Sequence, residues 1–368
     1  MKHAAYNAVS REEALFARDT VRFMLRLSNR HGIGHLMRGL NVCRELAAMG
    51  AAGRILFFGR AAPPRQLWDR RFEFRTEGET AGYRDWPQAM RSANPAVVVY
   101  DTTLPADDEW RREPEGAQRA YIMRRWKDER QQELLDHGLL PRIDAVIVPH
   151  TPEEFGHELP AWLRKRVSFV GPIVRLPDPL SQEKLRRRYA LTPADFVLTS
   201  TCGGGGFSTQ AKEFFATVWA VHRRLASERP NLRHIVVLGP NGCETPVPAP
   251  GMTLVDTEPD MVSLFAISDL VIAEGGYNTV NEIRVTRTPA LFMPGTRNLD
   301  DQEHRVRQLE ARGLAWVCAA SERHLAPAKA LALCRDSDAL DAMRRAYASD
   351  SPGIGNRRAA EILAELAA

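Results

Sequence analysis

The sequence lacks several features that mark particular classes of protein. Its five cysteines lie far apart and include no C-x-x-C pair, so a zinc ribbon or a redox dithiol is not expected. No run of about 18 apolar residues predicts a transmembrane helix, and residues 1–20 lack the apolar core of a secretory signal. We interpret 1–20 as a leader before the folded domains, and a reducing cytoplasm as the location that fits the cysteines best.

The sequence also has little lysine and only a small excess of positive charge. Lys and Arg number 50 against 46 Asp and Glu, a formal net charge of +4, and nearly all the cations are arginine. No stretch interleaves basic and aromatic residues, so a nucleic-acid partner is not expected. The arginines at 124, 125, 164 and 166 could favour a phosphate-bearing acceptor, but solvation of an ordinary surface explains them as well.

What the sequence does have is an alternation of short apolar runs with longer segments of helical spacing. Continuous apolar runs indicate strands buried on both faces, and their alternation with helices predicts parallel sheets in an α/β protein. The length of 368 residues suits two domains. We expect strands at 21–27, 54–59, 96–101, 119–123, 145–150, 168–173, 196–201, 234–239, 252–256, 270–274, 289–294 and 314–318.

Both halves of the sequence open in the same way, with a strand, a glycine-rich turn and a helix. The segment 173–185 between them contains prolines and polar residues, and it predicts a linker. The expected domains are therefore 21–172 and 186–350. Residues 351–368 begin with a turn signal and are expected to end as a helix.

The first glycine-rich turn, "RHGIGH", places His35 at the start of a helix. The partial positive charge of a helix N-terminus disfavours an imidazolium, so a neutral His35 could accept a proton as a general base. Gly32 and Gly34 let the backbone turn sharply and approach a ligand. A plain strand-to-helix turn is the alternative. Asp101, at the end of another predicted strand, either orients His35 or an acceptor, or simply caps the strand.

The second glycine-rich turn is "CGGGGFST" at 202–209. Four consecutive glycines expose backbone N–H groups before a helix, which suits a phosphate or diphosphate. No Gly-Lys-Ser/Thr follows, and the G-x-G-x-x-G spacing is incomplete, so neither common nucleotide motif is present. Ligands bind at the carboxyl ends of strands in α/β proteins, although a flexible loop without a ligand is the alternative.

A third motif, "AEGGYNTVNEI", occupies 273–283. Gly275 and Gly276 end a strand, and Asn278 and Thr279 are placed to cap the next helix. Glu282 lies one turn after Asn278 on the same face, where a carboxylate can accept both hydroxyls of a ribose.

A polar triplet follows the next predicted strand. Asp301, Gln302 and Glu303 begin a helix and offer donors and acceptors suited to sugar hydroxyls. For Asp301 and Glu303, ordinary acidic charge at a helix N-terminus is the alternative.

Together these motifs resemble the GT-B glycosyltransferases, above all glycosyltransferase family 28, which includes the bacterial N-acetylglucosaminyltransferase of lipid II synthesis. The resemblance covers nearly the whole chain and is strongest over 269–313. It implies two Rossmann-like domains facing across a cleft. The N-terminal domain would bind the acceptor and the C-terminal domain a nucleotide diphosphate-sugar, with uracil as the expected base. The family's final helix crosses back to the N-terminal domain, which suits 351–368.

The resemblance also implies roles for single residues. His35 and Asp101 would be catalytic, with Gly32, Gly34 and Arg38 on the acceptor side. The glycine loop would face the diphosphate, the carboxylate at 282 would bind the ribose, and the loop after 252–256 would hold the base. The sugar hydroxyls would meet the residue pair 301–302 or 302–303. The implied donor-binding residues are Gly203, Gly204, Gly205, Gly206, Thr257, Gly275, Gly276, Asn278, Thr279, Glu282, Asp301, Gln302 and Glu303.

The expected activity is therefore an inverting glycosyl transfer in which His35 deprotonates an acceptor hydroxyl or amine. No Asp-x-Asp motif ends a strand of the second half, so neither a metal nor a cofactor is expected. The four glycines followed by Phe207 depart from the Gly-Gly-Ser-Gln-Gly loop that is frequent in the family. In related nucleotide-sugar hydrolases a similar turn activates water, which is the main alternative, and a sensor without turnover is another. The family also suggests a peripheral contact with the inner face of the membrane.

Overall fold

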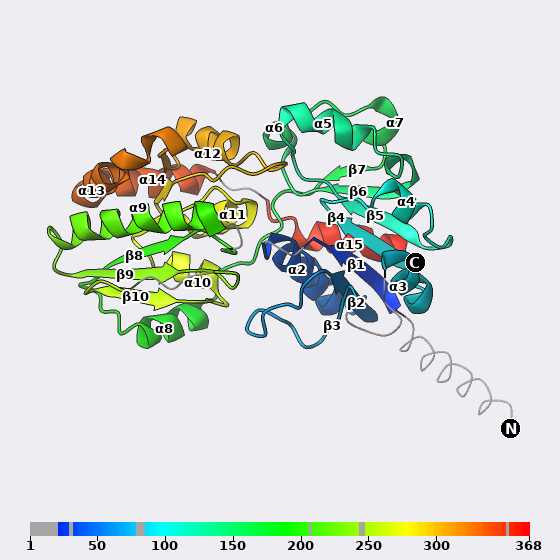
Figure 1. The fold of residues 1–368 in the computed structure, drawn as a ribbon, viewed down its shortest axis with the longest axis horizontal. Helices are drawn as coiled ribbons and strands as arrows, with labels where there is room; N and C mark the ends of the chain where they lie inside the picture. The colour runs from blue at the N-terminus through cyan, green and yellow to red at the C-terminus, as the bar shows by residue number, and fades with distance from the viewer. Residues whose placement is uncertain (1–20, 29–31, 79–84, 206–207, 243–246, 351–352) are drawn as a thin grey trace, which may run out of the picture. The chain divides into compact units, whose positions relative to one another are not determined.

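The computed structural model describes residues 21–28, 32–78, 85–205, 208–242, 247–350 and 353–368, and it divides into two compact units (Figure 1). Unit 1 contains the first strand, His35–Ile173 and Gly353–Ala368. Unit 2 contains Gly32–Gly34 and the described residues from Val174 to Asp350. The predicted leader 1–20 lies outside the described residues.

Unit 1 is built on a sheet of seven parallel strands in the order β3-β2-β1-β4-β5-β6-β7. Its strands are β1 Val21–Leu27, β2 Arg54–Gly59, β3 Glu73–Thr76, β4 Val97–Asp101, β5 Gln118–Ile122, β6 Ala145–Val148 and β7 Val167–Phe169. Its α-helices are α2 Gly34–Ala48, α3 Trp86–Ala93, α4 Asp107–Trp110, α5 Asp128–Leu135, α6 Pro152–Phe155, α7 Ala161–Arg164 and α15 Asn356–Leu366, and a 3-10 helix, η1, covers Leu140–Arg142.

Side chains alternate between the two faces of this sheet, as in any β-strand. Phe23 and Leu25 of β1 enter a core with Leu40 of α2 and Leu363 of α15. Met24, between them in the sequence, enters the core of the opposite face. Both faces are therefore covered, which accounts for the uninterrupted apolar strands that the sequence displays.

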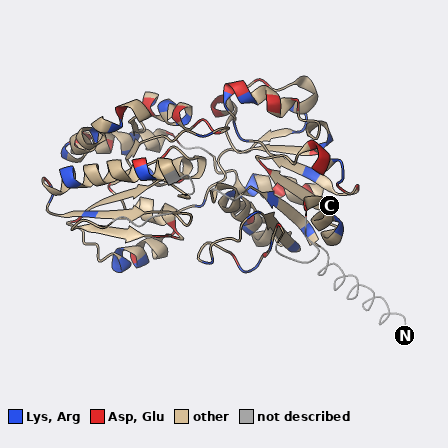
Figure 2. Cartoon of the chain, in the orientation of Figure 1, with Lys and Arg blue, Asp and Glu red and all other residues tan. Residues whose placement is uncertain are grey.

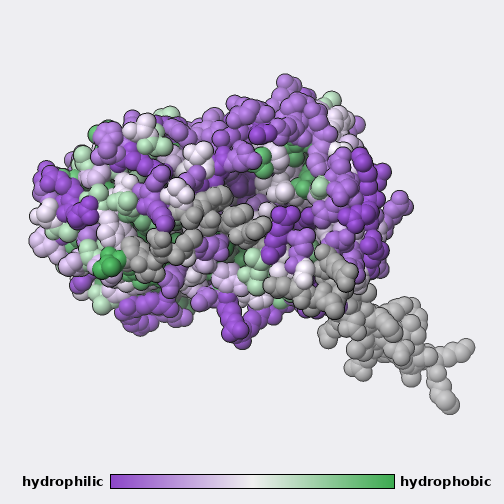
Figure 3. Space-filling model, in the orientation of Figure 1, coloured by the Kyte–Doolittle hydropathy of each residue, from purple (hydrophilic) through white to green (hydrophobic). Residues whose placement is uncertain are grey.

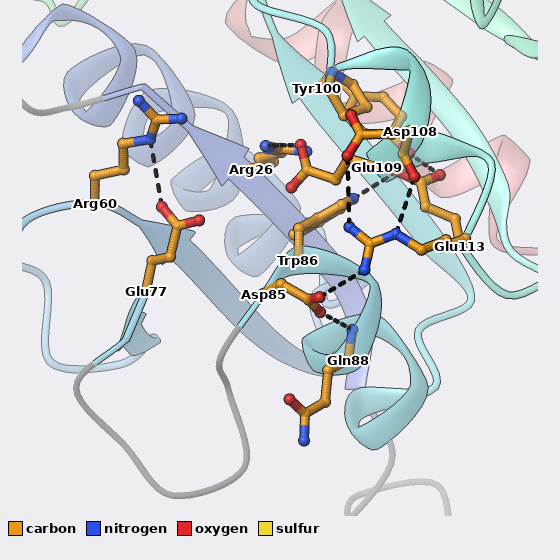
Figure 4. A network of polar contacts seen from close by, with 12 residues as sticks. Arg26, Arg60, Glu77, Asp85, Trp86, Gln88, Tyr100, Asp108, Glu109 and Glu113 are labelled. Atoms are coloured by element: carbon orange, nitrogen blue, oxygen red, sulfur yellow. Dashed lines mark hydrogen bonds and ion pairs between the residues drawn. The ribbon is translucent and has the colours of Figure 1, made fainter.

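Polar groups join the helices of the second face to the sheet (Figure 4). Glu113 accepts hydrogen bonds from Trp86 Nε1 and Tyr100 OH, both at 2.6 Å. Arg26 stacks on the Trp86 ring and pairs with Glu109 at 2.7 Å. Burial raises the pKa of Glu113, while the two hydrogen bonds oppose that shift. Both carboxylate oxygens of Glu113 are bonded within the cluster, so we assign it a structural role.

Unit 2 is built on a sheet of six parallel strands in the order β10-β9-β8-β11-β12-β13. Its strands are β8 Phe196–Thr201, β9 Leu232–Val237, β10 Met252–Val255, β11 Leu270–Ala273, β12 Ala290–Phe292 and β13 Trp316–Val317. Its α-helices are α8 Pro179–Arg188, α9 Ser208–Ala226, α10 Met261–Ala266, α11 Tyr277–Thr286, α12 Gln302–Ala311, α13 Ala326–Arg335 and α14 Ser337–Ser349, and a 3-10 helix, η2, covers Ala320–Leu325.

The predicted linker 173–185 is wrong over its second half, because that half is helical. Asp178 caps α8 by accepting from Ser181 N at 2.9 Å, and Pro179 fills the first helical position. Leu185 is buried in a core with Leu264 of α10. The prolines that suggest a linker here mark a helix start, and the segment belongs to unit 2.

Charged residues of both signs are interspersed over the surfaces of both units (Figure 2). Hydrophilic residues dominate the face drawn in Figure 3, and hydrophobic residues appear there only in small separate patches. Along the described ranges, no helix combines the length and apolar character needed to cross a bilayer.

Candidate functional site

Each sheet has one position where its strand order reverses. In unit 1 it lies between β1 and β4, and in unit 2 between β8 and β11. Open parallel sheets bind ligands beyond the carboxyl ends of the strands at this position, because the loops on either side diverge there. The predicted residues gather at both positions: His35 and Asp101 in unit 1, and the glycine loop in unit 2.

The unit 1 site joins a histidine to a buried carboxylate. His35 is the second residue of α2, and Asp101 is the last residue of β4. His35 Nδ1 lies 3.5 Å from Asp101 Oδ2, and their side chains are 20% and 1% exposed. A carboxylate facing Nδ1 favours a proton on that nitrogen, which leaves Nε2 free to accept one. This is the arrangement that a general base requires.

Arg38 holds the same carboxylate from the other side. Its Nε and Nη2 donate to Asp101 Oδ1 at 3.0 and 2.5 Å, and its Nη2 also donates to Thr102 Oγ1 at 3.0 Å. Arg38, predicted on the acceptor side, has a fully buried side chain. One helical turn after His35, it is positioned to hold Asp101 rather than a ligand.

Opposing influences act on the Asp101 carboxyl. Burial alone would raise its pKa, but the charges of Arg38 and His35 outweigh burial and lower the pKa to about 2. Asp101 is therefore an anion at neutral pH. Next to it, Thr102 has φ of 61°, and Tyr121 OH donates to the Thr102 carbonyl at 2.7 Å. That bond stabilises a backbone conformation that threonine rarely adopts.

The glycine loop of unit 2 follows β8 directly. Gly203 and Gly205 have φ of 76° and 73°, in the left-handed region that favours glycine. A Cβ on Gly205 would lie 2.7 Å from the Leu238 carbonyl oxygen, so packing also requires glycine there. Nothing within 4 Å would meet a Cβ on Gly203. That loop precedes the 19-residue helix α9, whose N-terminal amides can bind an anion. Gly206 lies outside the described residues.

Glu282 lies in α11 among other carboxylates that the sequence does not single out. Burial, reinforced by the negative charge of Asp260 and opposed by Arg175, raises the pKa of half-buried Glu282 to about 8. Asp260 pairs with Arg175 at 3.3 Å. Glu258, also buried, accepts from Arg188 and Tyr189 at 3.0 and 2.8 Å. The loop after β10, which also carries half-buried Thr257, therefore lies next to the proposed ribose carboxylate.

The predicted cap of α11 is wrong. Gly276 is the N-cap and uses no side chain, while Asn278 and Thr279 lie inside the first turn. Gly275 packs closely: a Cβ there would lie 2.7 Å from Val306 Cγ1.

The polar triplet at the start of α12 separates into three environments. Asp301 caps α12 by accepting from His304 N at 3.0 Å, as its alternative interpretation predicts. Gln302 is buried and accepts from Gly295 N at 2.9 Å, which leaves its amide nitrogen to donate. Glu303 is 54% exposed, 3.8 Å from Arg307. Of the three, Gln302 is the one held by both burial and a backbone contact.

The predicted site residues do not include a buried ion pair that lies beside them. Glu274 follows β11, and its Oε2 accepts from Arg297 Nη2 at 2.5 Å. The glutamate adjoins the Gly275–Gly276 pair, a signal that could have identified it, whereas nothing in the sequence singles out Arg297. Among the described residues, no group of three or more His, Cys, Asp and Glu side chains is arranged to hold a metal ion.

Comparisons with known proteins show which family and fold this chain is similar to. A family model described as the glycosyltransferase family 28 C-terminal domain matches residues 202–352. An uncharacterised glycosyltransferase of Methanopyrus kandleri is 25% identical over 186 residues, 49% of this chain and 51% of that protein, so the chain spans about half the length of this curated relative.

Solved structures match nearly the whole chain. The glycosyltransferase of kitacinnamycin gives a TM-score of 0.61 at 17% identity, over 95% of this chain and 100% of that one. MurG of Acinetobacter baumannii gives 0.58 at 13% identity, over 94% and 99%. At these identities the likeness shows the fold alone. The two parallel-sheet units are thus those of the GT-B fold, and residues 202–352 are similar to the glycosyltransferase family 28 C-terminal domain.

Proposed function

We propose that the protein is a glycosyltransferase that moves a sugar from a nucleotide diphosphate-sugar, UDP-sugar being the expected donor, to an acceptor hydroxyl or amine with inversion. The observation that carries the proposal is the His35–Asp101 pair at the reversal point of unit 1. It accompanies a region of unit 2 that is similar to the family 28 C-terminal domain.

In the proposed reaction His35 Nε2 takes the proton of the acceptor as its oxygen or nitrogen attacks the anomeric carbon. The bond from that carbon to the diphosphate oxygen breaks, and the diphosphate leaves with the electron pair. One displacement from the opposite side inverts the anomeric centre. The Asp101 anion holds Nδ1–H and stabilises the imidazolium that forms, while Arg38 fixes the carboxylate.

The donor is proposed to lie in unit 2. The glycine loop and the N-terminus of α9 receive the diphosphate, where their partial positive charge stabilises the leaving group. Glu282 accepts from the ribose, and Gln302 donates to a sugar hydroxyl. This assignment needs no metal ion, so activity should survive treatment with EDTA.

A thermal-shift panel tests the donor class first. UDP, ADP, GDP and dTDP are each added to the protein, and one of them should raise the melting temperature selectively. Stabilisation by none of them would contradict the proposal. Incubation of the corresponding nucleotide-sugar with and without candidate acceptors then separates transfer from hydrolysis. Free sugar released at the same rate whatever the acceptor would favour a hydrolase in which His35 activates water.

A further inference from the structure

The Glu274–Arg297 pair remains unassigned once the predicted donor-binding residues are placed. The two side chains are 4% and 13% exposed. One carboxylate oxygen, Oε2, is bonded to Arg297, and the other, Oε1, is buried without a hydrogen-bond partner. A Cβ on Gly295 would lie 2.8 Å from Oε1 and 3.0 Å from Arg297 Nη1, so a larger residue there would displace part of the pair. A pair that served structure alone would be expected to satisfy both oxygens, as bidentate pairs do.

Two hydrogen bonds place this pair beside the glycine loop. Arg297 Nη1 donates to Gln210 Oε1, in the first turn of α9. Glu274 N donates to the Thr201 carbonyl at 3.3 Å, at the end of β8. Burial chiefly raises the pKa of the Cys202 thiol to about 12, with Glu274 adding to the shift and Arg297 opposing it. The guanidinium therefore lies at the N-terminal end of α9, next to the loop proposed to hold the diphosphate.

We propose that Arg297 binds the diphosphate of the donor and that Glu274 positions Arg297 for it. This inference rests on the proposed function and deepens it. Arginine stays protonated and presents its N–H groups in a plane that suits phosphate oxygens. It adds a full charge where the loop and helix offer only partial charges, and the leaving diphosphate needs that charge most. Glu274 holds the guanidinium through one oxygen, and its own negative charge weakens diphosphate binding.

The two residues should therefore affect binding in opposite directions. Titration calorimetry compares the nucleoside diphosphate selected by the thermal-shift panel with the same nucleoside lacking phosphates. Arg297→Gln should weaken diphosphate binding about tenfold or more, the size of a lost charge-assisted hydrogen bond, and leave nucleoside binding unchanged. Arg297→Lys should retain part of the affinity. Glu274→Gln keeps a side-chain oxygen that can accept from Arg297 but removes the negative charge, so it should tighten diphosphate binding about twofold or more.

Arg335→Gln is the matched control. Arg335 pairs with Glu228 at 2.5 Å, just beyond the other end of α9, so its loss changes the net charge equally but away from the loop. It should leave both titrations unchanged.

Other results would overturn the inference. If Arg297 only ties α9 to the sheet, Arg297→Gln and Glu274→Gln would both lower the melting temperature and weaken nucleoside and diphosphate alike. Unchanged diphosphate affinity in Arg297→Gln would also refute it. If the wild-type protein binds none of the four nucleoside diphosphates, the proposed function itself fails, and the role of Arg297 fails with it. By contrast, a diphosphate that wild type and Arg297→Gln bind equally well would refute only the role of Arg297 and leave the proposed function standing.

Discussion

His35 and Asp101 form the contact on which the proposed chemistry depends. The strand ends and the glycine turn predict that both residues lie at the same edge of a sheet. The sequence could not predict the role of Arg38, because only packing shows that this side chain is fully buried against Asp101. The amphipathic pattern of the helix leaves an arginine at that position free to face either solvent or the sheet.

His35→Ala should reduce turnover by a factor of about 10² to 10⁴, the usual contribution of a general base, because no other group is proposed to take the acceptor proton. Nucleotide binding should persist, since the donor is assigned to unit 2. Steady-state kinetics and calorimetry on the same preparation measure the two effects. His324→Ala, at an exposed position in η2, is the control. Retained turnover in His35→Ala would disprove the base assignment.

Glu282→Gln should raise the stability of the folded protein and weaken its binding of the nucleoside diphosphate. The pKa of Glu282 rises from 4.5 to about 8 on folding, so its carboxylate destabilises the folded protein increasingly as the pH rises through that interval. Without ligand, the variant should melt at a higher temperature than the wild type, and the difference should grow between pH 4.5 and pH 8. Its affinity for the nucleoside diphosphate should fall, because an amide replaces the carboxylate that accepts the ribose hydroxyls.

Scanning calorimetry across that pH range and calorimetric titration provide the two measurements. A variant that loses both stability and affinity would show that Glu282 supports the fold instead of the ligand.

The helices and strands match the sequence-based predictions well where an apolar run specifies the element. They match poorly where the element depends on side-chain capping. At one edge of the unit 1 sheet, the edge strand β3, "EFRT", is polar and is not predicted, whereas its neighbour β2 is apolar and is predicted. An edge strand pairs on one side only, so it needs less apolar surface. The helix α8 is not predicted for a related reason. It buries a single leucine, so its sequence has almost no apolar periodicity, and a capping aspartate alone is a weak signal.

Between α9 and the strands β8 and β9, two histidines form a chain of hydrogen bonds. Only one placement of the protons on their ring nitrogens satisfies every bond in it. His222 Nε2 lies 3.1 Å from the Pro250 carbonyl and must donate, so His222 Nδ1 accepts from His234 Nδ1, 3.2 Å away. His234 Nε2 then accepts from Ser200 Oγ at 2.7 Å. Burial lowers the pKa of both histidines, most strongly that of His234.

Unit 2 should therefore lose stability as the pH falls below about 6.5, the ordinary histidine value. The unfolded chain takes up protons there that the folded histidines resist, so protonation favours unfolding. Chemical denaturation between pH 8 and pH 5 should show this slope for the wild type. His222→Phe/His234→Phe should give a flatter dependence whatever its absolute stability, and exposed His324→Ala should keep the wild-type slope. An unchanged slope in the double variant would assign the pH dependence elsewhere.

At the scale of the whole molecule, the two units have separate cores although the chain returns to unit 1 after the last residues of unit 2. Residues 353–368 follow unit 2 in the sequence, yet Leu363 is fully buried in the core that contains β1 and α2. Gly355 N donates to the Pro172 carbonyl at 2.7 Å, and a Cβ on Gly171, where φ is 80°, would lie 2.3 Å from the Gly353 carbonyl oxygen. Residues 353–368 therefore contact unit 1 at residues 171–172, close to the end of its His35–Ile173 segment.

Leu363→Ala should consequently destabilise unit 1 and spare unit 2, although residue 363 follows unit 2 in the sequence. Truncating a buried leucine costs about 2 to 5 kcal/mol, because apolar contacts are lost and a cavity remains. Scanning calorimetry should resolve one transition that falls in Leu363→Ala and a second that the selected nucleoside diphosphate raises in variant and wild type alike. Arg358→Ala, on the exposed face of α15, should move neither transition. If Leu363→Ala abolished the ligand-induced rise in melting temperature, the stability of unit 2 would depend on the final helix. The two units would then not unfold independently.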